Sequence, residues 1–190
     1  MTRKVILNLA VTLDGFIEGP NSEIDWCIME DDMQFDKFLE QIDTILFGRK
    51  SYDLWTEYQP NSNTPQSEYH MWELMQNTHK YVFSRTLQYS NPTTTYINNH
   101  IANTVNHLKA QPGKDIWLYG GSSIITTFLN QNLVDELQLA VHPIILAAGT
   151  PLFEAINNQK QLELSTVNTY KSGVVQLIYR QSTKNKSENS

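Results

Sequence analysis

Residues 116–129 (IWLYGGSSIITTFL) place a buried strand, a pair of glycines and the start of an amphipathic helix in immediate succession. The junction between a strand and a helix leaves backbone N–H groups without intrahelical partners, and such groups favour a bound anion. Gly120 and Gly121 let the backbone approach that anion closely, because neither residue carries a Cβ. The stretch therefore predicts an anion-binding turn at the carboxyl end of a strand, a feature typical of α/β folds.

The rest of the chain alternates segments of strand and helix character. Strands are expected at residues 5–10, 44–47, 80–84, 93–97, 116–119 and 134–146, and a closing antiparallel hairpin at 163–170 and 174–180. Helices are expected at residues 31–42, around 71–75, at 101–108 and in the segments that begin at 48 and 122, with a polar loop at 59–68. This order predicts an α/β fold with a central, mostly parallel sheet, flanking helices and antiparallel strands at its C-terminal end.

Length and composition indicate one globular domain. Of the 190 residues, 40% are hydrophobic and 18% are charged. We expect a single domain at residues 1–180 and a disordered tail at 181–190, which lacks apolar side chains. The formal net charge of −6 argues against binding to nucleic acid or to an anionic membrane surface. No apolar run reaches the roughly 20 residues that a membrane span needs.

Cysteine and histidine content restricts the chemistry further. Cys27 is the one cysteine, which excludes an internal disulfide framework and is compatible with a cytoplasmic protein. The histidines lack metal-ligand spacing, so no metal site is predicted and each histidine is expected at the surface or at an interface. They are His70, His79, His100, His107 and His142.

Three expected strand ends carry groups that bind phosphate, although the chain as a whole is acidic. They are Gly48-Arg49-Lys50-Ser51, Ser84-Arg85-Thr86, and the glycine pair followed by Ser122 and Ser123. Arginine binds phosphate through two nitrogens, and helix N-termini add N–H donors and a favourable dipole. An alternative is that Arg49 and Arg85 are ordinary surface cations and that the glycines only turn the chain. Together, the three sites favour a dinucleotide with several phosphates.

These segments resemble the dihydrofolate-reductase-like superfamily. Its motifs are matched by LDGFI (13–17), FGRKSY (47–52) and FSRT (83–86). Residues 117–153 are similar to the branch that contains the C-terminal reductase domain of the bifunctional riboflavin-biosynthesis protein RibD, without the deaminase motif that accompanies it there. The resemblance covers residues 3–180. It implies a three-layer fold, NADPH at the carboxyl ends of the strands, a cis peptide in the glycine pair, and a homodimer in which residues 134–146 could form the interface.

The resemblance also implies which residues bind the cofactor. They are Ala10, Ile17, Gly48, Arg49, Lys50, Ser51, Ser84, Arg85, Thr86, Gly120, Gly121, Ser122, Ser123 and Ile124. Within this set, Ser84 and Arg85 would lie near the adenosine 2′-phosphate and favour NADPH over NADH. Ala10 and Ile17 would flank the nicotinamide.

On the substrate side, Asp32 best matches the carboxylate that assists protonation in dihydrofolate reductases, and Asp31 is adjacent to it. The other substrate contacts expected are Trp26, Asp31, Phe35, Trp55 and Tyr119. The alternatives are that the aspartates cap a helix start and that the aromatic residues belong to the core. Tyr119 stands where the riboflavin reductases usually carry an acidic residue, and this difference removes a group suited to a ribityl-phosphate substrate.

The expected function is that of an NADPH-dependent oxidoreductase, which transfers a hydride to a small flat heterocyclic or imine-like substrate. Such an enzyme resembles 5-amino-6-(5-phosphoribosylamino)uracil reductase of riboflavin biosynthesis. Two alternatives stay open, namely dihydrofolate reductase activity and a non-catalytic protein that binds or senses NADPH.

Overall fold

The computed structural model describes residues 2–87 and 90–182 of the chain. The strands are β1 (Val5–Thr12), β2 (Phe16–Glu18), β3 (Ile42–Gly48), β4 (His79–Phe83), β5 (Ser90–Asn91), β6 (Thr94–Ile97), β7 (Asp115–Gly120), β8 (Glu136–His142), β9 (Thr150–Pro151), β10 (Leu162–Thr169) and β11 (Val175–Gln181). The helices are the 3-10 helix η1 (Asp31–Met33) and the α-helices α1 (Phe35–Glu40), α2 (Arg49–Glu57), α3 (Gln66–Asn77), α4 (Ile101–Ala110) and α5 (Ser122–Asn130).

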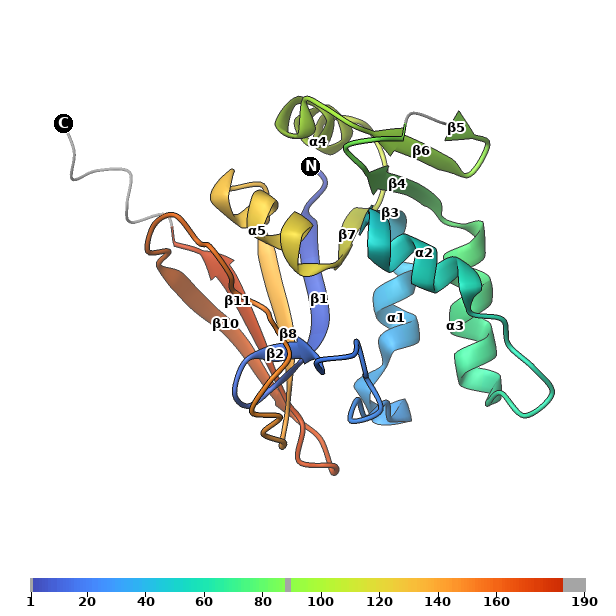
Figure 1. Ribbon diagram of the computed structural model, residues 1–190, viewed down its shortest axis with the longest axis vertical. Coiled ribbons are helices and arrows are strands. Elements are labelled where there is room, and N and C mark those ends of the chain that lie inside the picture. The colour runs from blue at the N-terminus through green and yellow to red at the C-terminus, as the bar shows by residue number, and fades with distance from the viewer. Residues whose placement is uncertain (1, 88–89, 183–190) are drawn as a thin grey trace.

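Within the described residues, a large sheet has the strand order β10-β11-β8-β1-β7-β3-β4-β6-β5, and β2 pairs with β9 separately. The pairs from β8 to β6 along this order are all parallel. The hairpin of β10 and β11 is antiparallel and joins the sheet by antiparallel pairing with β8. Figure 1 shows this hairpin at the opposite side of the sheet from β4 and β6. The predicted α/β class, mostly parallel sheet and C-terminal hairpin are confirmed.

Helices cover both faces of the sheet and create two apolar cores. On one face, Val105 of α4 and Phe128 of α5 pack with residues of β1 and β7. On the other face, Phe38 of α1 and Met75 of α3 pack with residues of β3 and β7. Successive residues of β1 contribute to one core and then to the other, because side chains alternate across a strand. The result is the three-layer arrangement that was expected.

The helix predicted at residues 31–42 is wrong in its extent. Gln34, with a φ of 52°, separates η1 from α1, and Ile42 is the first residue of β3. A left-handed residue breaks the repeat of helical hydrogen bonds. The apolar spacing still selects the correct inward side chains, since Phe38 and Leu39 are buried. Such spacing reports which residues face the core and does not report the backbone conformation between them.

Three other predicted boundaries also shift. α3 begins at Gln66, within the predicted loop at 59–68, and β8 is shorter at both ends than the strand predicted at 134–146. At the C-terminal end, β11 extends to Gln181, the first residue of the predicted tail. Residues 183–190 of that tail lie outside the described residues.

Two properties of the described residues bear on possible partners. Between residues 2 and 87 and between 90 and 182, no helix has the length and apolar character needed to cross a membrane. The same parts of the chain contain no group of three or more histidine, cysteine, aspartate or glutamate side chains that could hold a metal ion.

Candidate functional site

The three predicted phosphate-binding segments meet at one edge of the sheet. β7, β3 and β4 are parallel neighbours, so their carboxyl ends lie side by side. In the strand register, Phe47 pairs with Gly120, and Gly48 pairs with Phe83. Segments that are more than 30 positions apart in the sequence, such as 48–51 and 84–86 or 84–86 and 120–123, therefore come together. The sheet order supplies this proximity, which the local motifs could only suggest.

Gly48 and Gly121 allow two helix starts to approach each other closely. Gly48 is the N-cap of α2 and Gly121 is the N-cap of α5. A Cβ on Gly121 would lie 3.0 Å from Ser51 Oγ, and a Cβ on Gly48 would lie 3.3 Å from the Gly120 carbonyl oxygen. The Gly120–Gly121 peptide is cis, as expected. This edge thus combines bare backbone with two helix N-termini, which favour an anionic ligand.

The predicted cations at this edge differ in their surroundings. Arg49 donates through Nε to both carboxylate oxygens of Asp53, at 2.7 and 2.6 Å, and this ion pair orients the guanidinium along α2. Lys50 is exposed beside it. Arg85 is exposed after β4, and it has no ion pair with any residue of the described ranges. Arg85 is therefore the guanidinium at this edge whose charge is not already compensated by a carboxylate.

Ser84 shapes the turn that presents Arg85. It is 7% exposed, and its Oγ lies 3.4 Å from the Thr86 N–H and 3.2 Å from the Leu87 N–H, which donate to it. Its own N–H donates to the Ile97 carbonyl at 2.9 Å. These hydrogen bonds are those of a turn in which the hydroxyl replaces a backbone acceptor. Ser84 is thus tied to the backbone, while Thr86 is exposed with Arg85.

The other predicted cofactor residues lie at or near this edge. Ser122, Ser123 and Ile124 form the first turn of α5, with Ile124 buried in the core. Ile17 in β2 is half-buried and packs against the same core. Ala10 lies in β1, paired with Ala140 of β8. β1 is the neighbour of β7 on the side away from β3, so Ala10 is one strand removed from the glycine pair.

Tyr119 directly precedes the glycine pair and belongs to an aromatic layer. Its ring centroid lies 4.6 Å from that of Phe47 and 5.0 Å from that of Trp117. Burial raises the pKa of the Tyr119 phenol, and the charge of Cys27 adds to this shift. Among the predicted substrate contacts, Tyr119 is therefore the one that stands next to the glycine pair.

Two other predicted substrate contacts pack mainly in the protein core. Trp55 of α2 is 9% exposed, and its ring lies 5.7 Å from that of Phe47 in a tilted contact. Phe35 of α1 lies 5.5 Å from Trp117 in an edge-on contact. Both side chains help to attach a helix to the sheet, which is the alternative that isolated aromatic residues favour.

Trp26 lies in the segment between β2 and η1, which is held to the sheet by His142. The Trp26 and His142 rings meet edge-on at 5.2 Å. His142 Nε2 accepts the Ile28 N–H at 3.0 Å, and His142 Nδ1 lies 2.9 Å from the Ala140 carbonyl. The prediction that every histidine is a surface or interfacial residue is wrong for His142, which is 1% exposed. The His142 ring thus takes the place of a backbone acceptor for the N–H of Ile28, which is 114 residues away in the sequence.

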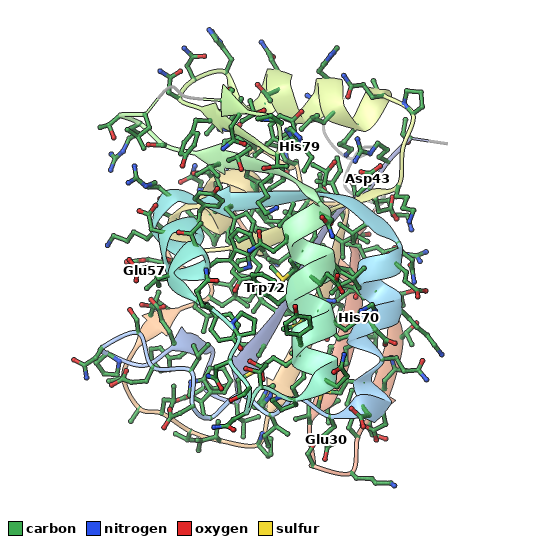
Figure 2. All side chains as sticks on the ribbon, turned by 90° about the vertical axis from the view of Figure 1, so that its right-hand side faces the viewer. Glu30, Asp43, Glu57, His70, Trp72 and His79 are labelled. Atoms are coloured by element: carbon green, nitrogen blue, oxygen red, sulfur yellow. The ribbon has the colours of Figure 1, made fainter. Side chains whose placement is uncertain are left out.

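Asp31 and Asp32 lie in η1, which directly precedes Gln34 and α1. Both are exposed residues of η1. Figure 2 shows the preceding residue, Glu30, at the lower end of the molecule. Asp32 lines a cavity of about 700 Å³ between α1 and the strands β1, β8, β10 and β11. In the strand order, β8, β11 and β10 follow β1 on the side away from β7.

Comparison with known proteins assigns the family. Residues 3–176 match the family model described as RibD C-terminal domain. The chain belongs to this family. Among its relatives, it is 54% identical over 177 residues to the Bacillus subtilis (strain 168) protein YyaP, covering 93% of this chain and 94% of YyaP. It is 31% identical over 183 residues to YwjB from the same organism, covering 94% and 98% of the two chains. The resemblance predicted from the sequence is confirmed.

Solved structures show the same fold at low identity. A protein from Shewanella sp. PV-4 named for riboflavin biosynthesis has a TM-score of 0.75 and 21% identity, covering 96% of this chain and 99% of that one. The deaminase/5-amino-6-(5-phosphoribosylamino)uracil reductase of Thermotoga maritima has a TM-score of 0.69 and 14% identity, covering 95% and 57%. Dihydrofolate reductase from Enterococcus faecalis, complexed with NADP(H), has a TM-score of 0.65 and 12% identity, covering 96% and 99%. The dihydrofolate-reductase-like fold is confirmed, and the RibD C-terminal reductase family supports a reductase-type function for the chain.

Proposed function

We propose that this protein is an NADPH-dependent reductase that acts on a small flat heterocyclic or imine-like substrate. The observation that carries the proposal is the close approach of two glycine-capped helix starts at one edge of the sheet. A Cβ at Gly121 would lie 3.0 Å from Ser51 Oγ, so only a glycine lets the two helix starts approach this closely without displacing Ser51. Backbone N–H groups at helix starts suit the pyrophosphate of a dinucleotide.

The residues at this edge fit NADPH in chemical type. Gly48, Ser51 and the glycine pair would receive the phosphates that join the two nucleotides. Arg85, exposed and without a carboxylate partner in the described part of the chain, would receive the adenosine 2′-phosphate. Bound NADPH would supply the hydride to the substrate carbon. The protein would orient the two reactants and deliver a proton.

The cofactor can be tested by thermal unfolding with NADPH and with NADH. At a concentration of 100 times Kd, a ligand that binds only the folded chain adds about 2.7 kcal/mol to the free energy of unfolding. We expect NADPH to raise the melting temperature more than NADH does, and we expect Arg85→Ala to reduce this preference. Arg180→Ala is a matched control, because Arg180 is an exposed arginine on β11, across the sheet from the glycine edge. A wild-type protein that neither cofactor stabilises would refute the cofactor assignment.

Turnover separates the reductase from the two alternatives. The absorbance of the reduced nicotinamide is followed with each of three candidate substrates. They are dihydrofolate, 5-amino-6-(5-phosphoribosylamino)uracil and a cyclic imine. Oxidation of NADPH by the imine or by the uracil compound supports the proposal. Turnover with dihydrofolate alone would indicate a dihydrofolate reductase. Tight NADPH binding without turnover of any of the three would favour a sensor.

We also propose that the protein is a homodimer. β8, which lies within the segment 134–146, has a paired strand on each side, so its backbone is not available to a second copy. β10 is instead the edge strand, and its side chains Leu164 and Val167 are 54% and 48% exposed. Exposed apolar residues on an edge strand favour association with another chain. The contact expected between two copies is therefore at β10.

A further inference from the structure

Tyr119 is held in a fixed place beside the glycine pair. It is the last side chain of β7 before that pair, and it packs against the core formed with α1, α2 and α3. Phe47, which precedes the N-cap of α2, and Trp117 both contact its ring. The phenol thus stands directly before one glycine-capped helix start and packs against the residue that precedes the other. Its ring has apolar partners on two sides, so its direction is set by packing.

The hydroxyl of Tyr119 is not committed to a protein partner. In the described ranges, no hydrogen bond of Tyr119 Oη is found. In these ranges, the buried side-chain nitrogen and oxygen atoms that lack a hydrogen-bond partner are Trp26 Nε1 and Trp72 Nε1. Tyr119 Oη is not among these buried atoms, so solvent or a ligand can reach it. A half-buried ring with an unpaired but reachable hydroxyl is available to a ligand.

The surroundings of Tyr119 keep its proton in place. Burial raises the pKa of Tyr119, and the charge of the neighbouring Cys27 raises it further. The Tyr119 phenol is therefore protonated, and a hydrogen-bond donor, at pH 7. The carboxylates considered for this role, Asp31 and Asp32, are both exposed residues of η1.

We propose that Tyr119 Oη–H donates the proton that completes reduction of the substrate. This inference rests on the proposed reductase function. For an imine, the carbon receives the hydride and its two electrons from NADPH, which leaves as NADP⁺. The electron pair of the C=N π bond moves to nitrogen, which takes the proton from Tyr119 Oη and forms the N–H bond of the amine. Water returns a proton to the phenolate. A nitrogen with a new electron pair is a much stronger base than a phenolate, so this transfer is favourable in spite of the raised pKa.

The first test measures binding to the protein without NADPH. Isoquinoline carries one neutral ring nitrogen that accepts a hydrogen bond, and naphthalene has the same shape without it. We expect the wild type to bind isoquinoline about 3- to 10-fold more tightly than naphthalene, since one hydrogen bond contributes about that much. Tyr119→Phe should abolish this preference. Tyr81→Phe is the matched control, because Tyr81 is half-buried and packs on the opposite face of the sheet.

The outcomes of this binding test separate the two proposals. A preference that persists in Tyr119→Phe would overturn the role of Tyr119 and leave the reductase function intact. Failure of the wild type to bind either compound up to its solubility limit would count against a cleft for flat heterocycles, and hence against both proposals.

The second test uses substrates that differ in their need for a proton. Reduction of 3,4-dihydroisoquinoline requires one proton on nitrogen, whereas the N-methyl-3,4-dihydroisoquinolinium cation requires none. We expect Tyr119→Phe to slow NADPH oxidation by the neutral imine at least about 100-fold, the usual contribution of a positioned acid. The rate with the cation should change little. Equal slowing of both substrates would assign Tyr119 to packing, and unchanged rates with both would refute its role.

Discussion

Lys80 is a buried lysine whose charge should make the stability of this fold depend on pH. Its side chain is 2% exposed, and no ion pair with a residue of the described ranges compensates it. Nζ donates to the carbonyls of Gln76 at 3.0 Å and Thr78 at 2.7 Å, at the end of α3, and lies 4.8 Å from the centroid of the Trp55 ring. Burial lowers the pKa of Lys80 from 10.5 to about 8. The two carbonyl dipoles and the face of the Trp55 ring thus compensate only in part for the water that the Lys80 ammonium loses on burial.

The sign of the effect follows from the two pKa values. Between about 8, the pKa of Lys80 in the folded chain, and 10.5, its ordinary value, the unfolded chain binds more protons. The free energy of unfolding therefore rises with pH across this window. Below pH 8, the cost of the buried charge is present in full, and a shift of this size corresponds to about 3 kcal/mol. Between pH 7 and pH 10, about 2 kcal/mol of this cost should be removed.

Lys80→Met isolates this contribution, because methionine has a similar unbranched shape and no charge. Urea unfolding of wild type and variant at pH 7 and pH 10 gives four free energies of unfolding. We expect the difference between wild type and Lys80→Met to move by about 2 kcal/mol in favour of wild type at the higher pH. Other titrating groups are common to both proteins and cancel in this comparison.

The control for this experiment is Lys171→Met, since Lys171 is exposed in the turn between β10 and β11. Its difference from wild type should be the same at both pH values. If the difference for Lys80→Met is also independent of pH, Lys80 titrates like an exposed lysine, and the reasoning from its burial is refuted.

Other parts of the structure give three further predictions. Gly121→Ala should weaken NADPH binding at least about tenfold, measured by nicotinamide fluorescence, because the new Cβ would lie 3.0 Å from Ser51 Oγ; unchanged affinity would move the cofactor elsewhere. His142→Ala should lower the free energy of unfolding by about 2–3 kcal/mol and speed hydrogen exchange of the Ile28 amide, its donor; unaltered exchange would contradict this anchoring role. Light scattering should find a dimer that Leu164→Glu converts to a monomer, and a monomeric wild type would refute the proposed contact at β10.

Much of the candidate site could be predicted because its signals are local. The glycine pair, the cations after β3 and β4, and the strand or helix character around them are each encoded within a few residues. Helical and strand periodicity also selected the inward side chains, even where the helix at 31–42 proved to be interrupted at Gln34. What these signals have in common is that backbone conformation and side-chain chemistry are set by neighbours in the chain.

His142, which was misjudged, and Lys80, whose burial the sequence did not indicate, depend instead on distant partners. His142 is buried because the backbone of Ile28, 114 positions away, supplies its hydrogen bond. Lys80 is buried because the end of α3 and Trp55 are folded over it. No short motif predicts the burial of either residue, because histidine and lysine are polar and are expected at the surface in any local sequence.

By itself, the sequence of this chain determined the α/β class, the family and the strand ends that could hold a dinucleotide. Only the tertiary structure decided which of these groups stand together. Strand order brought Gly48 beside Gly120, and the packing of α1 on the sheet placed Asp32 at a cavity lined by α1 and the strands β1, β8, β10 and β11. It also placed Tyr119 next to the glycine pair, where its hydroxyl has no hydrogen-bond partner among the described residues. The physical reason is that a site is formed by packing between segments remote in sequence, and that packing follows from the apolar surface that all segments bury together.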